Sequence, residues 1–374
     1  MWNVAIIGGR LQGIEAVYLA KKAGFRSLLV DQNPKAPAGG FCDEMGVFDV
    51  VRKEARLIEF LKRADFILPA LENDAVHAAL VEIAEEHGLP LAFDKEAYAI
   101  ASSKRKSDRL MEDHRIPAPR AFPAGGGPYI LKPSEESGSA GVFRAETAEE
   151  VSRFLAETRD PESWVAQEYL EGPSYSIEII GRPGLYRTYE VTEIHMDDVY
   201  DCKMVTAPCE LPAAKEKELA ETAEALANLI GLRGIMDVEV IDCGGALNVL
   251  EIDARLPSQT PMVVYHCSGV NLLAELAELT MSGGFAGAAP RGTRKYAALE
   301  HYLIDGDGVH SIGERVMGEG GPLTYRERFF GADEVLSDYG GGRAPWRGAF
   351  LNAGKTAAEL AAKRDATRRA LTEK

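Results

Sequence analysis

The chain has 374 residues, of which 46% are hydrophobic and 27% are charged, and its formal net charge is -16 at pH 7. A chain of this length holds two or three domains of roughly 100 to 200 residues, and its ordinary composition excludes wholesale disorder and fibrous repeats. Because so much negative charge repels nucleic acid and anionic lipid, we expect neither nucleic acid nor a membrane as a partner. The densest basic cluster is Lys104, Arg105, Lys106 and Arg109, and nucleotide phosphate is its better target.

The five cysteines indicate a reducing compartment. Their number is odd and they include no C-x-x-C pair, so we expect neither a disulfide framework nor a zinc ribbon. The apolar stretch at residues 1–7 runs directly into glycines, lacks a basic leader and is too short for a signal peptide or a membrane span. These features predict a cytoplasmic protein.

Residues 1–98 predict an α/β domain with a parallel open sheet, because short apolar runs alternate with segments of helical spacing. We expect strands at 4–7, 27–31, 66–69 and 91–93, and helices at 11–23 and 74–87. Residues 99–173 predict a small α+β lid domain, which is entered through a hinge at Pro117 and Pro119. Its expected elements are helices at 102–114 and 148–158, strands at 129–131 and 164–167, and a small-residue loop at 134–141.

The rest of the chain predicts a third domain at 174–330 and an extension at 331–374. Its expected elements are a helix at 213–230, two long strands at 236–242 and 247–253, and an amphipathic surface helix at 356–374. The fold class is therefore α/β combined with α+β.

The first candidate site is the motif Gly8-Gly9-Arg10-Leu11-Gln12-Gly13, which follows a strand and opens a helix. Its backbone amides are able to receive an anion or a carboxylate, but a tight strand-to-helix turn explains it equally well. Arg10 stands where the dinucleotide fingerprint G-x-G-x-x-G requires glycine, so the motif does not indicate NAD.

The strongest signal is a pair of acidic strands at 236–255. With period-two alternation, Asp237 and Glu239 share one face, while Glu251, Asp253 and Arg255 share a face of the next strand. Converging carboxylates are costly to bury unless they bind a hard divalent cation, and Mg²⁺ is the best fit. The alternative is a solvated strand face, which does not account for the neighbouring arginine.

Two weaker signals lie upstream of these strands. Lys132 ends a strand beside the loop at 134–141, so together they offer a point charge and backbone donors to a polyphosphate. The segment 164–172 offers an apolar strand edge that ends in Glu168, which suits an adenine ring. Either one alone is equally well read as an ordinary strand and turn.

In their order, these segments resemble the ATP-grasp superfamily over residues 1–310, with an N-terminal Rossmann-like domain. The resemblance implies ATP and two Mg²⁺ ions as cofactors. The residues that it implies for ATP are Arg10, Lys104, Lys132, Ser137, Gly138, Glu168 and Leu170. For the metal it implies Glu239, Glu251 and Asp253, the last at a position that is commonly Asn in the family.

Within the superfamily, the chain is similar to the pyrrolysine-biosynthesis ligases, which join 3-methyl-D-ornithine to the ε-amine of L-lysine. The similarity lies in the motif at 8–16, in Lys21-Lys22-Ala23-Gly24, in Asp31-Gln32-Asn33-Pro34 and in residues 235–261. It implies that Leu11, Gln12 and Glu72 hold lysine, and that Glu178, Arg255 and Ser258 hold the other amino acid. It further implies Arg255 and Lys132 as catalytic residues, and a homodimer.

Two alternatives remain open from the sequence. One is a different ATP-grasp reaction, such as carboxylation of a nucleotide or a D-alanine-type ligation, at the same ATP site. The other is a nicotinamide-dependent oxidoreductase or a nucleotide-binding module built on the N-terminal domain. Arg10 and the acidic strands both speak against the second.

Overall fold

A computed structural model describes residues 2–135, 141–287, 294–341 and 345–373. The N-terminal part contains a four-stranded parallel sheet in the order β3-β2-β1-β4. Its strands are β1 (Asn3–Ile7), β2 (Arg26–Asp31), β3 (Glu44–Val47) and β4 (Phe66–Pro69), and its helices are α1 (Leu11–Ala23), α2 (Ala55–Leu61) and α3 (Asp74–His87). Short 3-10 helices lie at η1 (Pro37–Gly40) and η2 (Val50–Arg52). The predicted parallel sheet and both of its predicted helices are confirmed.

The predicted strand at 91–93 is wrong. Leu91 makes only an isolated parallel bridge to Ile67 at the edge of the sheet. The chain leaves the sheet directly afterwards, because the Asp94 side chain accepts a hydrogen bond from the amide of Ala97 and starts helix α4 (Lys95–Ala101).

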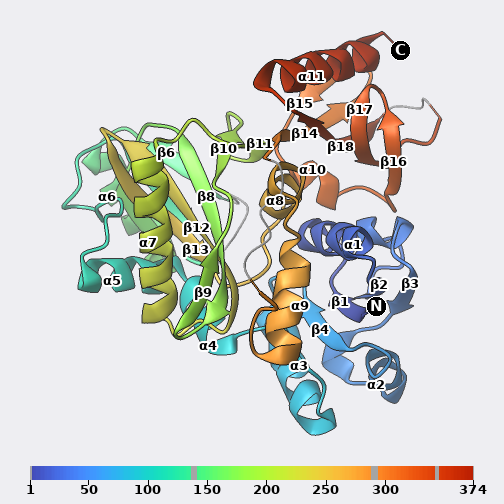
Figure 1. The fold of residues 1–374 in the computed structure, drawn as a ribbon. Coiled ribbons are helices and arrows are strands. Elements are labelled where there is room, and N and C mark those ends of the chain that lie inside the picture. Colours follow the sequence, from blue (N-terminus) through green and yellow to red (C-terminus); the bar gives the residue numbers. More distant parts are fainter. Residues whose placement is uncertain (1, 136–140, 288–293, 342–344, 374) are drawn as a thin grey trace.

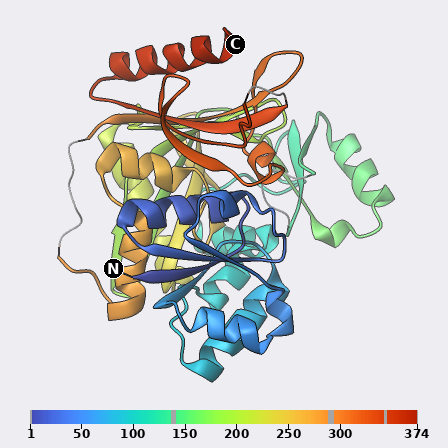
Figure 2. The ribbon, with the colours of Figure 1, turned by 90° about the vertical axis from the view of Figure 1, so that its right-hand side faces the viewer.

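A small antiparallel sheet follows in the order β6-β5-β7, with strands β5 (Tyr129–Pro133), β6 (Phe143–Ala145) and β7 (Trp164–Glu168). Helix α5 (Lys104–His114) precedes it, and α6 (Ala148–Glu157) and η3 (Pro161–Ser163) lie between its last two strands. In Figure 2 this sheet and α6 stand to one side of the main body. The predicted helix at 102–114 begins two residues late, since Ser102 and Ser103 connect α4 to α5.

The largest sheet has eleven strands in the described part of the chain, along the path β13-β12-β8-β10-β11-β14-β18-β17-β16. Its strands are β8 (Ser174–Arg182), β9 (Leu185–Thr188), β10 (Thr192–Met196), β11 (Cys202–Ala207), β12 (Gly234–Cys243), β13 (Ala246–Asp253), β14 (Tyr296–Ile304), β15 (Val309–Ser311), β16 (Thr324–Phe329), β17 (Ala332–Ser337) and β18 (Trp346–Gly354). The accompanying helices are α7 (Ala213–Leu229), α8 (Thr260–Ser268), α9 (Leu272–Ser282), α10 (Arg315–Gly318) and α11 (Ala357–Thr372). Helix α7 packs on β8 and β12, while α11 covers β14 and β18 at the other end of the sheet (Figure 1).

The predicted domain boundary at 330/331 falls inside the hairpin of β16 and β17, so the extension continues the same sheet. The N-terminal domain is also tied to this sheet. Helix α1 packs against α8 and α9, and one hydrophobic core runs from Val4 and Val17 through Val263 and Leu276 to Leu299. We therefore expect the positions of α1 and α8 to depend on each other.

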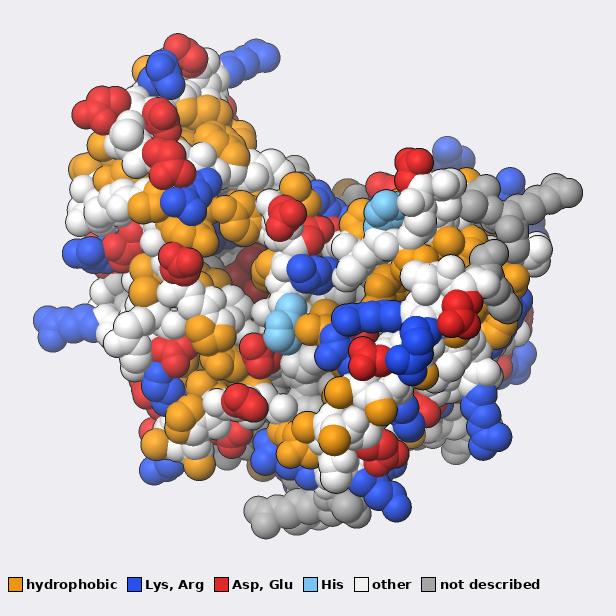
Figure 3. Space-filling view, turned by 90° about the horizontal axis from the view of Figure 1, so that it is seen from above, with side chains coloured by type: hydrophobic (Ala, Val, Ile, Leu, Met, Phe, Trp, Pro, Cys, Tyr) orange, Lys and Arg blue, Asp and Glu red, His pale blue; other side chains and the backbone are white. Residues whose placement is uncertain are grey.

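On the face seen from above, Lys and Arg side chains are interspersed with Asp and Glu, with no extended region of one sign (Figure 3). No helix within the described ranges is long and apolar enough to cross a bilayer.

Candidate active site

The acidic side chains form two rows across three neighbouring strands. Asp237 of β12 pairs with Glu178 of β8 on one side and with Asp253 of β13 on the other. In the next row, Glu239 pairs with Glu251. Because residues that are paired across an antiparallel sheet project to the same face, the structure brings together the carboxylates that the sequence analysis had assigned separately to metal and to substrate.

A β-bulge places a lysine beside these rows. The register of β12 and β13 shifts after Glu239, which pairs with Glu251 while Val240 pairs with Val249, so Leu250 has no partner in the ladder. The carbonyl oxygen of Leu250 lies 3.5 Å from the Nζ atom of Lys132 on β5. Burial lowers the pKa of Lys132 below its usual value.

A second lysine reaches the same place from α5. Lys104 is the first residue of that helix, is only 8% exposed, and lies with its Nζ atom 3.0 Å from Oε1 of Glu251. Burial by itself would lower the pKa of Lys104, but Glu251 and further carboxylates raise it overall. The two predicted phosphate lysines therefore converge on the acidic strands.

Arg255 joins the acidic rows to the N-terminal domain. Its NH2 atom lies 2.8 Å from Oδ2 of Asp253 and 2.8 Å from Oε1 of Glu72. The same Glu72 oxygen accepts a hydrogen bond of 2.7 Å from Nε2 of Gln12. The predicted metal strands and two of the residues implied for lysine thus form one continuous polar chain.

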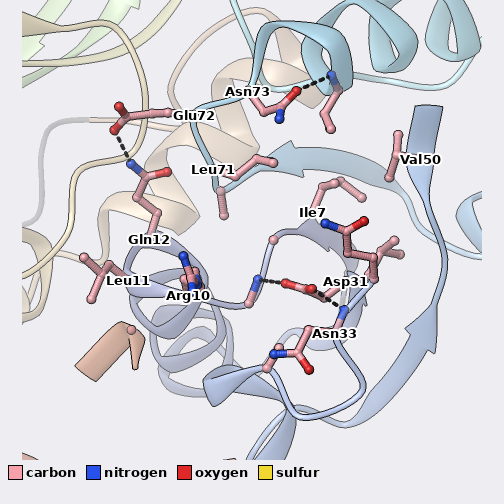
Figure 4. A pocket seen from close by; sticks show the side chains of 18 of the residues that line it. Ile7, Arg10, Leu11, Gln12, Asp31, Asn33, Val50, Leu71, Glu72 and Asn73 are labelled. Carbon is pink, nitrogen blue, oxygen red and sulfur yellow. Dashed lines mark hydrogen bonds between the residues drawn. The ribbon is translucent and has the colours of Figure 1, made fainter. Parts of the chain in front are cut away.

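A large cavity of about 850 Å³ lies at the carboxyl ends of β1, β2 and β4. Gln12 and Glu72 point toward each other on one side of it, and Arg10 and Leu11 lie beside them at the start of α1 (Figure 4). Asp31 closes the adjoining turn by accepting hydrogen bonds from the amides of Gly9 (2.8 Å) and Asn33 (2.7 Å).

The glycines of the motif serve the tight turn between β1 and α1. Gly8 has φ 101°, and a Cβ atom on Gly13 would lie 2.1 Å from the carbonyl oxygen of Gly8. The turn reading of this motif is therefore confirmed, and the cavity that it borders is wide enough for an amino-acid substrate.

Two further cavities share lining residues with this cavity or with each other. One of about 690 Å³ is lined by Glu72 and also by Lys104, Glu251 and Asp253. Another of about 100 Å³ is lined by Asp253, Arg255 and Ser258. Since Glu72 borders the first two cavities and Asp253 borders the last two, the three spaces follow one another from β1 to β12.

The loop after β13 is held in an unusual conformation. Gln259 has φ 69° and ψ -56°, and the amide of Thr260 donates to the carbonyl oxygen of Ser258 at 2.8 Å, which together define a strained γ-turn. Glu15 of α1 accepts hydrogen bonds from the amides of Gln259 and Met262 at this turn. Glu15 was missed by the sequence analysis, although an acid among apolar helix residues was a usable signal.

Burial strongly perturbs the acids of the two rows. It raises the pKa of Glu239 to about 7, with the neighbouring charge of Glu251 adding to the effect. Burial also raises the pKa of Glu178 to about 7 and that of Asp237 and Asp253 well above their usual values. These carboxylates therefore gain from a bound cation, which favours their ionised form.

Two of the acids in these rows face basic side chains. Among the described residues, no group of three or more His, Cys, Asp or Glu side chains is arranged to hold a metal ion. Glu251 and Asp253 instead face Lys104 and Arg255. The donor set still fits a hard cation, because Glu239, Glu251 and Asp253 supply carboxylate oxygens from two adjacent strands.

The two residues implied for adenine lie at the end of β7 and just beyond it. Both oxygens of Glu168 face Arg120, with Oε2 2.8 Å from its NH2 atom, so this carboxylate is already paired. Leu170 is half-buried just beyond β7. Ser137 and Gly138 lie outside the described residues.

Residues 101–259 match the ATP-grasp domain family. The 3-methyl-D-ornithine–L-lysine ligase of Methanosarcina barkeri is 37% identical over 325 residues, which cover 86% of this chain and 85% of that protein. The chain belongs to this ligase family. It is accordingly an ATP-dependent ligase, and the predicted family, fold class and enzyme class are confirmed.

Solved structures support the fold of this ligase over nearly its whole length. An L-amino acid ligase from Bacillus licheniformis superposes with a TM-score of 0.69 at 15% identity, covering 98% of this chain and 97% of that one. The biotin carboxylase domain of the 2-oxoglutarate carboxylase of Hydrogenobacter thermophilus, a dimer solved with MgADP, ADP and bicarbonate, gives 0.72 at 14% identity and covers 95% of this chain and 87% of that one. These likenesses concern the fold alone.

The ligase site also contains acids that the sequence analysis did not single out. Glu314, just before α10, accepts a hydrogen bond of 2.9 Å from Oγ of Ser258. Asp108 of α5 accepts one of 3.0 Å from Nε2 of Gln167, and burial raises its pKa to about 6. No local pattern marks either residue, because each reaches the site through a contact between distant segments.

Proposed function

We propose that the enzyme joins the carboxylate of 3-methyl-D-ornithine to the ε-amine of L-lysine, with conversion of ATP to ADP and phosphate. The observation that carries the proposal is the pairing of Arg255 with both Asp253 and Glu72. It supports the proposal because it joins β13, whose acids we assign to Mg²⁺, to Glu72 at the large cavity, which we assign to L-lysine. A carboxylate activated near Arg255 is then adjacent to the amine that must attack it.

The reaction has two steps. In the first step, an oxygen of the substrate carboxylate attacks the γ-phosphorus of ATP. The bond between the γ-phosphorus and the bridging oxygen breaks, ADP leaves, and an acyl phosphate forms. The neutral amine then attacks the acyl carbon, the carbon–oxygen bond to phosphate breaks, and the amine loses its proton as the amide forms. Positioning and neutralisation of charge account for most of the rate enhancement in such a reaction.

Two lysines, three acids that would hold Mg²⁺, and one arginine would together neutralise the negative charge of ATP and of the reacting carboxylate. Lys104 and Lys132, which reach the acidic strands from α5 and β5, would bind the phosphates of ATP. Glu239, Glu251 and Asp253 would hold two Mg²⁺ ions, which supply charge neutralisation to the triphosphate when bound. Arg255 would stabilise the negative oxygen that develops at the acyl carbon.

We assign each of the remaining site residues to ATP or to one of the two amino acids. We assign Arg10, Glu168, Leu170 and the loop residues Ser137 and Gly138 to ATP, with the loop excluding water from the acyl phosphate. We assign Leu11, Gln12 and Glu72 to lysine. The hydrogen bond between Gln12 and Glu72 supports this, since it fixes the carboxylate toward the large cavity. Glu178, Arg255 and Ser258 are assigned to the activated amino acid.

The test is release of ADP by the purified protein with MgATP and D-ornithine or 3-methyl-D-ornithine, with and without L-lysine. We expect turnover that needs both amino acids and a product with the mass of the dipeptide. Glu251→Gln should abolish turnover, whereas Glu218→Gln at an exposed site on α7 should not change it. Turnover only with some other carboxylate would keep the ATP-grasp chemistry and exclude these substrates.

Two assignments concern the state of the protein in the cell. We propose that it acts in the cytoplasm, where its free cysteines stay reduced. We also propose a homodimer. Light scattering of the purified chain at two concentrations tests the dimer, and a monomer at both would exclude it.

A further inference from the structure

Glu72 lies in the short segment between β4 and α3, and a histidine of α3 holds the backbone just before it. The carboxylate of Glu72 accepts a hydrogen bond from Gln12 (Figure 4) and pairs with Arg255. The Nε2 atom of His77 lies 3.0 Å from the carbonyl oxygen of Leu71. Because a carbonyl oxygen only accepts, Nε2 of His77 carries the proton of this hydrogen bond.

This hydrogen bond spans a stretch of backbone between two regular elements. The sheet ends at the amide of Ala70, which donates to the carbonyl oxygen of Ile7 at 2.8 Å. In α3, the amide of His77 donates to the carbonyl oxygen of Asn73 at 2.9 Å. Residues 71 and 72 lie between these two supports, so the His77 side chain adds a third support where the direction of the Glu72 side chain is set.

The ring of His77 is itself fixed in an aromatic cluster. It is only 4% exposed, and its centroid lies 4.5 Å from that of Phe93 and 4.6 Å from that of Tyr98. Phe93 lies just before α4, and Tyr98 lies within α4. The cluster therefore joins α3 to α4, and the nitrogen that holds Leu71 has a rigid base.

Packing alone does not account for a histidine at this position. Its Nδ1 atom is buried and has no hydrogen-bond partner in the part of the chain that the structure describes. Burial lowers the pKa of His77, which keeps the ring neutral at neutral pH with its one proton on Nε2. A phenylalanine would pack in the same cluster without the cost of an unpaired buried nitrogen. The bond to Leu71 is what the histidine adds.

We propose that His77 is a positioning residue for the capture of the amine, which holds Leu71 and thereby keeps the carboxylate of Glu72 directed at the amine. The inference rests on the proposed function, since it takes Glu72 as the residue that binds L-lysine. An acyl phosphate formed beside Arg255 is attacked either by the amine or by water. When Glu72 is misdirected, water attacks more often, and the acyl phosphate returns to the free carboxylate and phosphate without forming the amide.

Two substitutions separate the hydrogen bond from the packing. His77→Phe keeps a ring in the aromatic cluster and removes the donor to Leu71. His77→Gln removes the ring and keeps an N–H donor at a similar reach. His114→Phe makes the first exchange at an exposed position at the end of α5 and is the matched control. The KM for each substrate and the ratio of ADP released to dipeptide formed are measured for all of them.

We expect His77→Phe to raise the KM for L-lysine by about three- to tenfold, which corresponds to the loss of one hydrogen bond of ordinary strength. The ratio of ADP to dipeptide should rise with it. The KM for ATP and for D-ornithine should change less than about twofold, and His77→Gln should recover most of the loss. In a Glu72→Gln background, His77→Phe should add less than about twofold, because both changes act on one contact.

A measurement without substrate tests the same claim. In hydrogen exchange followed by mass spectrometry, His77→Phe should speed the exchange of the amides at 71–73 by about fivefold or more, and His77→Gln should do so less. Unchanged exchange at these amides would overturn the proposal.

Three kinetic results would also overturn it. They are an unchanged KM for L-lysine in His77→Phe, an equal rise in the KM for all three substrates, and a full additional effect in the Glu72→Gln background. Absence of turnover in the unmodified protein with MgATP, L-lysine and either ornithine would instead refute the proposed function. The exchange measurement would then still decide whether His77 holds the segment of Glu72.

Discussion

The carboxylate of Glu15 accepts a hydrogen bond from the backbone amide of Gln259 at 3.0 Å, across 244 positions of sequence. Its other oxygen accepts from the amide of Met262 at 2.5 Å. Helix α1, which begins beside the large cavity, is therefore fastened to the first turn of α8, which follows Ser258. The side chain of Glu15, which is 2% exposed, therefore holds the start of α8 in a fixed position relative to α1.

Replacing Glu15 tests this coupling. Glu15→Ala should lower the free energy of unfolding by about 1–3 kcal/mol, because it leaves buried amides unpaired next to a strained turn. It should also raise the KM for the activated amino acid more than the KM for ATP. Denaturant unfolding and steady-state kinetics measure the two effects. Glu15→Gln, which keeps one acceptor, should recover part of both, and an equal loss in the two variants would contradict this account.

We expect Glu72, which we assign to L-lysine, to control the capture of the amine. Glu72→Gln should raise the KM for L-lysine by about tenfold, because a charged acceptor for the ammonium becomes neutral. The ratio of ADP released to dipeptide formed should also rise, since an acyl phosphate that meets no amine is hydrolysed. Both are measured in one coupled assay with mass detection, using Glu86→Gln on the exposed side of α3 as control. A rise in the KM for D-ornithine alone would assign Glu72 to the other substrate.

Glu178 makes stability depend on pH. Burial raises its pKa to about 7 in the folded protein, above the ordinary value of 4.5 that applies when the chain is unfolded. The folded state therefore binds the proton more tightly, and the free energy of unfolding falls as pH rises from about 4.5 through 7. The full effect is about 3 kcal/mol, at 1.36 kcal/mol for each pKa unit.

Glu178→Gln removes this titration. Between pH 5 and pH 8, the free energy of unfolding of the unmodified protein should fall relative to that of the variant by up to about 3 kcal/mol. Urea unfolding at several pH values, in the absence of nucleotide, measures it. A difference that is constant across this range would show that Glu178 titrates normally.

Glu334 ties the C-terminal strands to the N-terminal domain. Its carboxylate lies 2.6 Å from Nζ of Lys22 and accepts a hydrogen bond of 2.6 Å from the hydroxyl of Tyr18. Glu334→Ala should lower the free energy of unfolding by about 3–5 kcal/mol, because it leaves a mostly buried lysine without its carboxylate. Asp365→Ala, at an exposed position on α11, should have an effect within about 0.5 kcal/mol. Similar losses in the two variants would exclude a special role for this contact.

Several elements were predictable because their causes are local. Helix α1 ends at Gly24, which adopts φ 69°, and α3 is capped by Asn73 at its start, so composition and spacing fix their bounds. The ligase family was readable from the order of the lysine, loop and acidic segments, a property of the chain that needs no tertiary contact. The same local reasoning failed at 91–93, where a capping aspartate outweighed the apolar run.

The sequence by itself determined that β12 and β13 carry acids on alternating positions, since a strand has a period of two. Only the tertiary structure decided which acids lie opposite one another, because register and the bulge at Leu250 depend on pairing between strands. It also decided that Arg255 meets Glu72 and that Glu314 meets Ser258, contacts that span 183 and 56 positions. Such contacts have no local cause: they follow from how the sheet, α1 and α10 pack on one another.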